Sequence, residues 1–126
     1  MAKHELLTRI EEVVLTAVAG VAQAYGMSIF EECRKITGGR YISIGSIYTI
    51  LDRLQKKGLV TSWFGGTNDP TCHSGKRCFK ITEAGIQAIR EAAELSRSLR
   101  LAWNSVLQAK KASAEHRLEA KTHRAG

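Results

Sequence analysis

The side chains best suited to chemistry gather around Cys72, His73 and Cys78. Thiolate and imidazole groups are good ligands for zinc or copper(I), and the neighbouring Lys76 and Arg77 would lower the pKa of a nearby thiol. The spacing is poor for a metal, because we expect Cys78 in a strand and the other two in a loop. The three cysteines are an odd number without an export signal, so reduced thiols are expected. A metal-responsive or thiol-responsive function of these residues stays an alternative.

Catalytic patterns are missing from the sequence. It has no Gly-x-Ser-x-Gly, no glycine loop of the kind that cradles a phosphate, and no helical His-Glu-x-x-His. We therefore expect neither an enzyme nor a cofactor.

The charge balance indicates a polyanionic partner. The 126 residues contain 19 Lys and Arg against 12 Asp and Glu, which gives a formal charge of +7. Basic residues are in excess at both ends, eleven against seven in residues 1–82 and five against two in residues 110–126. Glu5, Glu11 and Glu12 interrupt any signal peptide, and the uncharged segment 13–30 is too polar to span a membrane. We expect a cytoplasmic protein without a membrane partner.

The hydrophobic periodicity predicts three helices in the first half of the chain. One apolar stripe covers residues 5–19, and a second short helix follows Tyr25-Gly26 and stops at Gly38-Gly39. Ser43 is the expected N-cap of a third helix that Gly58 closes. The buried side of the second helix is predicted as Ile29, Phe30, Cys33 and Ile36, and that of the third as Ile44, Ile47, Leu51 and Leu54.

After Gly58 the hydrophobic periodicity changes from that of a helix to the two-residue period of a strand. Residues 59–64 and 77–81 form short runs rich in β-branched and aromatic side chains, joined by a polar segment with several glycines, which predicts a β-hairpin with a long loop. Trp63 is expected at the base of this hairpin. Thr82 then caps a fourth helix that continues to about residue 112.

The fourth helix needs a partner, because a long helix in water is marginal unless its apolar stripe is covered. We expect a second copy to cover it in a two-fold dimer, through an interface made by Leu99, Trp103, Val106 and Leu107. Two Trp103 indoles brought together there would sandwich a planar apolar small molecule. Packing of Trp103 on the first helix is the simpler alternative. The basic tail 113–126 is expected to be frayed or disordered.

Three helices, a hairpin and a further helix are the order of a winged helix-turn-helix. The expected fold is thus mainly α with a small β-hairpin: a DNA-binding domain over 1–82, a dimerisation helix over 83–112 and the tail over 113–126. In this arrangement the third helix enters the major groove of double-stranded DNA, and the hairpin loop reaches a flanking phosphate backbone. The residues expected at the DNA are Ser43, Gly45, Ser46, Thr49, Arg53, Lys76 and Arg77, with Lys56 and Lys57 as further phosphate contacts.

Several short motifs occur in a fixed order along the chain, and together they give a specific resemblance to a known family. They are Tyr25-Gly26-Met27-Ser28-Ile29, Ser43-Ile44-Gly45-Ser46-Ile47-Tyr48 with Leu51 and Arg53-Leu54, Lys57-Gly58-Leu59-Val60, Gly75-Lys76-Arg77, and Phe79-Lys80-Ile81-Thr82-Glu83-Ala84-Gly85. In register over roughly residues 5–90, the chain resembles the PadR family of transcriptional regulators, and its short remainder resembles the small subgroup with a single C-terminal helix. The resemblance implies a homodimer that binds a palindromic operator, usually as a repressor released by a small effector. It also implies a phosphate contact for Tyr48, for which the simpler role is a half-buried ring that braces the third helix.

Two positions depart from the family pattern. Thr49 stands where the family commonly has proline, and the hairpin loop is longer, with Asp69-Pro70-Thr71-Cys72-His73. The alternative to a DNA-binding regulator is a winged-helix module that binds another protein and needs no basic face.

Overall fold

The computed structural model describes residues 5–125, and side chains within them through residue 119. Four helices and one hairpin follow in the order α1 (Arg9–Gly20), α2 (Gly26–Thr37), α3 (Ile44–Lys56), β1 (Val60–Phe64), β2 (Arg77–Ile81) and α4 (Glu83–Ala125). The chain divides into two compact units, residues 1–92 and 93–126. The expected mainly helical winged fold is confirmed.

The helices of the first unit begin and end at local signals. Thr8 and Glu11 form a reciprocal capping box at the start of α1. Gly38 ends α2 in the left-handed conformation that glycine adopts without strain. The Thr82 hydroxyl accepts from the backbone N–H of Gly85 at 3.0 Å, so Thr82 starts α4 as predicted. The caps therefore place the starts of these helices, and the end of α2, within a few residues of the sequence-based bounds.

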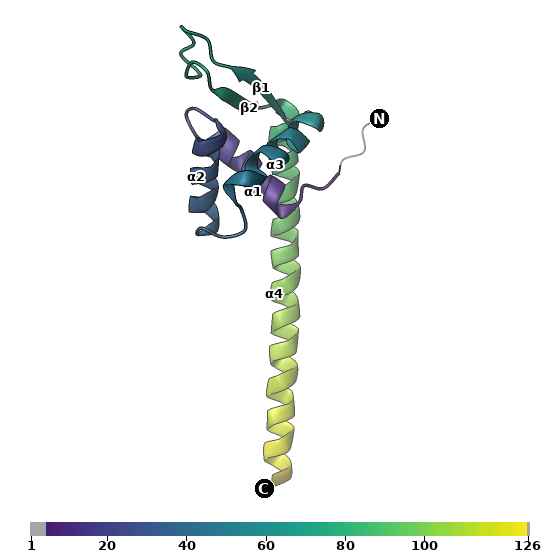
Figure 1. Ribbon diagram of the computed structural model, residues 1–126. Helices are drawn as coiled ribbons and strands as arrows, with labels where there is room; N and C mark the ends of the chain where they lie inside the picture. Colours follow the sequence, from purple (N-terminus) through teal and green to yellow (C-terminus); the bar gives the residue numbers. More distant parts are fainter. Residues whose placement is uncertain (1–4, 126) are drawn as a thin grey trace. The chain divides into compact units, whose positions relative to one another are not determined.

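One hydrophobic core holds α1, α2, α3 and the hairpin together (Figure 1). The strands pair antiparallel, with Val60 opposite Ile81 and Phe64 opposite Arg77. The backbone N–H of Phe79 donates to the carbonyl of Ala24 at 2.7 Å, which attaches the hairpin to the start of α2. The fully buried aliphatic side chains are Val14, Leu15, Ala17, Ile29, Ile47, Leu51, Leu54 and Val60.

Two predicted core positions are wrong. Ile36 and Ile44 are exposed, with 46% and 44% of their surface accessible, and Ile50 is buried instead. Ile36 lies in the last turn of α2 and Ile44 is the first residue of α3. At a helix end, a side chain has a helical turn beside it on one side only, so less of its surface is covered. Helical periodicity alone does not report where a helix leaves the core.

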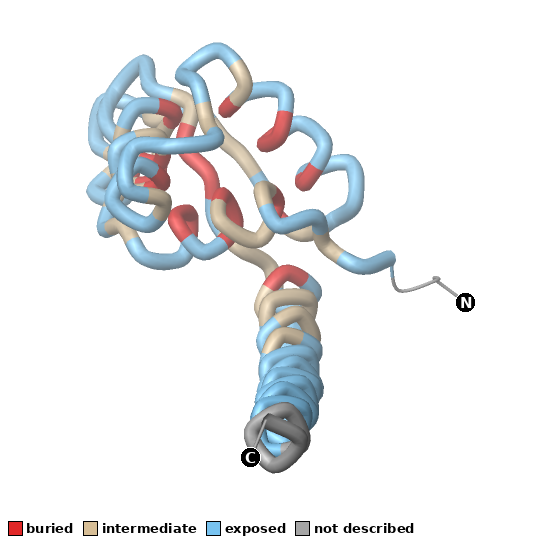
Figure 2. Tube along the Cα trace, turned by 90° about the horizontal axis from the view of Figure 1, so that it is seen from below, coloured by how far each residue is buried: buried red, intermediate tan, exposed pale blue. Residues whose placement is uncertain are grey.

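The expected end of the last helix near residue 112 is also wrong, because α4 continues to Ala125. Residues 113–119 contain Ala, Glu, Arg and Leu, which have high helix propensity, and no Gly or Pro. Side chains 97–119 are all exposed, and Figure 2 shows the contrast with the buried positions of the first unit. Within the described residues, no helix is both long and apolar enough to cross a membrane.

Candidate nucleic-acid interface

The N-terminus of α3 is built from two reciprocal serines. The Ser43 hydroxyl accepts from the backbone N–H of Ser46 at 3.3 Å, and the Ser46 hydroxyl accepts from the N–H of Ser43 at the same distance. The Ser46 hydroxyl also donates to the carbonyl of Ser43 at 2.8 Å. Its hydrogen is therefore in use, whereas that of Ser43 has no acceptor in the described part of the chain. Since a phosphate oxygen accepts only, Ser43 is better placed to bind it than Ser46.

The exposed face of α3 carries most of the predicted contact residues. Gly45, Tyr48, Thr49 and Arg53 are exposed, and the opposite face buries the core residues of the helix. A methyl group added at Gly45 would meet nothing within 4 Å, so the backbone of this first turn is open to close approach. Thr49 and Arg53 make no side-chain hydrogen bond or ion pair within the described residues. The structure thus leaves a polar, cationic face available on α3.

Tyr48 connects this face to α2. The residue is 47% exposed, and its hydroxyl lies against Gly26, where an added methyl group would overlap it. Tyr48 is therefore both a brace between α3 and the start of α2 and a partly accessible phenol. The predicted phosphate contact and the simpler bracing role are compatible in this geometry.

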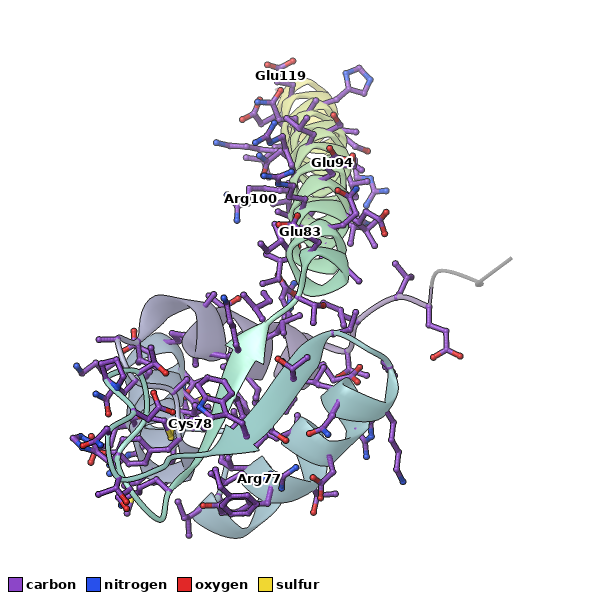
Figure 3. All side chains as sticks on the ribbon, turned by 90° about the horizontal axis from the view of Figure 1, so that it is seen from above. Arg77, Cys78, Glu83, Glu94, Arg100 and Glu119 are labelled. Carbon is purple, nitrogen blue, oxygen red and sulfur yellow. A yellow bond between two sulfur atoms is a disulfide. The ribbon has the colours of Figure 1, made fainter. Side chains whose placement is uncertain are left out.

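Arg77 joins the hairpin to α3. Its guanidinium donates to Asp52 Oδ1 at 3.2 Å, to Gln55 Oε1 at 3.0 Å and to Ser62 Oγ at 3.4 Å. It also lies 4.8 Å from the centre of the Phe79 ring. Figure 3 shows the side chain between the hairpin and α3. All three hydrogen bonds come from Nη2, so a phosphate contact through this nitrogen competes with an internal network.

Lys76 is more accessible than Arg77. It is exposed, and its ammonium lies 4.7 Å from the centre of the Tyr25 ring, within the range of a cation–π contact. The ammonium keeps hydrogen-bond donors for a phosphate while the ring limits where it moves. Of the two adjacent basic residues, Lys76 is the better candidate for a contact with DNA.

Lys57 has a different partner from the one expected. Its ammonium lies 2.8 Å from Glu11 Oε2 and 3.8 Å from Glu5 Oε2. Glu11 is fully buried, and burial alone would raise its pKa; hydrogen bonds from Lys57 and Thr8 outweigh burial and hold the pKa below its ordinary value. Sequence analysis missed this pair because its members are 46 residues apart. Lys57 therefore stabilises the contact between α1 and the end of α3.

The expectation that all three cysteines are reduced is wrong. Cys72 and Cys78 form a disulfide whose Cα atoms are 6.0 Å apart, and Cys33 is free and buried. The hairpin loop folds back so that Cys72 reaches the strand that contains Cys78, a contact that spacing alone does not reveal. Burial raises the pKa of the Cys33 thiol to about 11, with a smaller contribution from the charge of Glu32.

The disulfide also changes the metal alternative. Paired sulfur atoms are not thiolate ligands, so Cys72 and Cys78 offer no metal site with His73 in this state. Within the described residues, no group of three His, Cys, Asp or Glu side chains is placed to hold a metal ion.

The base of the hairpin loop is organised by an aspartate. Asp69 accepts from the Thr71 hydroxyl at 2.6 Å, from the Thr71 N–H at 2.8 Å and from the Trp63 indole at 3.0 Å. These hydrogen bonds, those from Thr71 foremost, hold the pKa of Asp69 below its ordinary value. Trp63 is half-buried and serves the wing base, as its position in the sequence predicts.

The predicted interface residues of α4 share one exposed stripe. Leu99, Trp103, Val106 and Leu107 are 57%, 57%, 41% and 45% exposed. Their spacing of four, three and one residues places them on one side of a helix. Exposed apolar side chains in such a row are typical of a surface that another helix covers.

A helix with a polar exposed face, braced by a hairpin whose loop carries basic residues, defines a winged helix-turn-helix protein of the DNA-binding class. The family model of PadR-like transcriptional regulators matches residues 14–91, and the chain belongs to this family. No curated protein matches the sequence significantly.

Solved structures share the fold. A PadR-like transcriptional regulator from Bacillus cereus is 24% identical, with a TM-score of 0.62 over 79% of this chain and 91% of that one. A PadR family regulator from Clostridium difficile is 16% identical, with a TM-score of 0.63 over 77% and 97% of the two chains. A transcriptional regulator from Clostridium thermocellum is 22% identical, with a TM-score of 0.61 over 76% and 87%.

Proposed function

We propose that the protein is a homodimeric repressor that binds a palindromic operator and is released by a small effector. The observation that carries the DNA-binding part is the exposed face of α3, where Thr49 in the middle of the helix and Arg53 in its last turn are accessible and uncommitted. Residues at the start of such a helix reach base edges in the major groove, and the positive end of the helix dipole favours phosphate.

The wing adds contacts that are independent of sequence. Lys76 is exposed, lies against the Tyr25 ring and supplies a positive charge for the phosphate backbone. Arg77 acts mainly by holding the wing on α3 through Asp52 and Gln55. The proposed division of labour is base readout by α3 and backbone contact by the wing.

Two copies are required for a palindromic site, because each protomer presents one recognition helix. The apolar stripe of α4 supports a two-fold pairing, in which two Trp103 side chains come together and bind a planar apolar effector. Adding planar aromatic compounds to the Trp63→Phe variant, which retains Trp103 as its one tryptophan, should change the fluorescence. Unchanged emission with every compound would remove the effector from this proposal. The cytoplasmic location stays a prediction.

A salt titration of duplex binding tests the function. The logarithm of the binding constant should fall linearly with the logarithm of salt concentration, because bound phosphates release counterions. A flat response, or no binding at about 50 mM salt, would instead favour a module that binds another protein. Enrichment from a random duplex pool should yield an inverted repeat with half-sites about 10 base pairs apart.

Two variants separate readout from backbone contact. Arg53→Ala should weaken the enriched operator by about 1–3 kcal/mol and random duplexes much less. Lys76→Ala should weaken both about equally and lower the salt slope by about one. Identical effects of the two variants on both duplexes would contradict the assignment of α3 as the reader.

A further inference from the structure

The Cys72–Cys78 disulfide fixes the wing loop, defined here as residues 65–76, to strand β2. Cys78 lies opposite Trp63 in the hairpin and also forms a backbone bridge with Tyr25 at the start of α2. The anchor of the loop is therefore a point that both the hairpin and α2 hold in place.

The cross-linked segment contains two adjacent basic residues. Lys76 and Arg77 lie between the paired cysteines, one against Tyr25 and the other against Asp52 and Gln55. A cross-link of six residues' separation limits the conformations of everything inside it. The state of this bond thus acts directly on Lys76, which contacts the phosphate backbone in the proposed function, and on Arg77, which holds the wing on α3.

Without the bond, few contacts hold the loop. Backbone hydrogen bonds join Gly65 to Lys76 at 2.9 Å and to Gly75 at 3.2 Å, and the Asp69 turn is bonded to Trp63. Cys72 is the one residue of the loop that is buried; the others are exposed or half-buried. A segment with so little buried apolar surface opens at low cost once its cross-link is removed.

Carbonyl groups of the loop itself lie against the Cys72 sulfur. Cys72 Sγ lies 3.3 Å from the carbonyl oxygen of Lys76 and 3.7 Å from that of His73. The flanking Thr71 and His73 are exposed. Opening of the wing loop therefore exposes the disulfide to a reductant without unfolding of the core.

We propose that Cys72 and Cys78 form a reversible redox site that sets the affinity of the wing for DNA. A thiolate of a dithiol reductant attacks one sulfur, the Cys72–Cys78 bond breaks, and a mixed disulfide forms. The second thiol of the reductant then displaces the protein thiol, which leaves two protein thiols and one oxidised reductant. Two electrons and two protons pass to the protein, and the reverse exchange with an oxidised dithiol restores the bond.

The direction of the effect follows from ordering, and it rests on the proposed DNA binding. The oxidised wing is already ordered, whereas the reduced wing must immobilise Lys76 and its neighbours on binding. We expect reduction to weaken duplex binding by roughly two- to tenfold, the equivalent of one or two ordered side chains. Cys33 does not compete in the exchange, since it is buried in the core and its thiolate is scarce.

The test compares the full chain in buffers of oxidised and reduced dithiothreitol. Alkylation after denaturation, followed by mass spectrometry, should add one label to the oxidised protein and three to the reduced one, because the chain has three cysteines. Binding to a random-sequence duplex is measured at the same salt in both states. In the Trp103→Phe variant the remaining Trp63 reports the state of the loop, and its emission should change with the label count.

The Cys72→Ala/Cys78→Ala variant supplies the control. It should bind duplex like the reduced wild type and should not respond to the redox buffer. Equal affinities of the oxidised and reduced wild type for duplex DNA would overturn the redox proposal and leave DNA binding intact. The same conclusion would follow if the folded protein took only one label in excess reductant, because the disulfide would then not be reducible. Absence of duplex binding in both states would overturn the proposed function and the redox site with it. The wild-type comparison decides the matter even where the double variant does not fold.

Discussion

The buried carboxylate of Glu11 shows how one charge depends on one partner. Glu11 caps α1 through the backbone N–H of Thr8 at 2.9 Å, and Lys57 neutralises it from the far end of α3. A buried carboxylate without a counter-charge is costly, whereas a paired and hydrogen-bonded one is tolerated. The pair therefore ties the first helix to the last turn of the recognition helix.

Lys57→Met should lower the free energy of unfolding at neutral pH by about 2 kcal/mol. This is less than for a fully buried pair, because the Lys57 side chain is 29% exposed. The deficit should shrink on acidification: the folded pKa of Glu11 lies below its ordinary 4.5, so the pair stabilises above that pH and its contribution is lost as pH falls through the folded pKa.

Urea unfolding of both proteins between neutral and acidic pH measures this difference. Lys56→Met is the matched control, since Lys56 is exposed, and it should change stability by less than about 0.5 kcal/mol. A deficit that stays constant with pH would show that the charge of Glu11 is not involved.

Two helical glycines have contrasting surroundings, one where α2 meets α3 and one on the exposed first turn of α3. Gly26 has the Tyr48 hydroxyl against it, whereas Gly45 has open space. Gly26→Ala should displace Tyr48 and lower stability by about 1–3 kcal/mol. Gly45→Ala should raise stability by up to about 1 kcal/mol, since alanine favours a helix.

The two variants should differ again in DNA binding. Gly45→Ala should weaken duplex binding despite the gain in stability, because its methyl group keeps the backbone away from a phosphate. Thermal melting and duplex titration on the same samples check both expectations. If the Gly45→Ala protein bound DNA as well as wild type, the first turn of α3 would not lie against the phosphate backbone of the DNA.

At the scale of the elements, the sequence predicts the features that neighbouring residues determine, such as helix ends and strands. The Ser43 cap, the end of α2 at Gly38 and the strand β2 over residues 77–81 are all found where the residue pattern places them. The partners of Arg77 and Lys57 were missed because they come from other elements of the fold. The disulfide was missed for the same reason, and the length of α4 was underestimated because burial rather than helix propensity guided the expectation.

For the whole molecule, the exposed apolar stripe of α4 predicts association of two copies of the chain. Leu99 and Leu101 are both exposed leucines, 57% and 64%, yet they lie on opposite sides of the helix. Leu99→Glu should weaken the proposed dimer by about 10- to 100-fold, because the substitution enters a two-fold interface twice. Leu101→Glu should leave association unchanged.

Sedimentation over a range of concentrations measures both variants. Their helix propensities change equally, so a difference between them reports the face of the helix and not its stability. Monomeric wild-type protein at micromolar concentration would contradict the dimer, and equal effects of the two substitutions would assign the interface to another surface.

The Arg77 network also bears on any attempt to redesign the specificity of this protein. Asp52 and Gln55 occupy α3 but hold the hairpin, so a transplanted helix without acceptors at these two positions would lose the contacts that hold the wing. A graft confined to Thr49, Arg53 and their exposed neighbours would spare that connection. New DNA targets would therefore be reached most easily by substitutions on the exposed face of α3 that leave Asp52 and Gln55 unchanged.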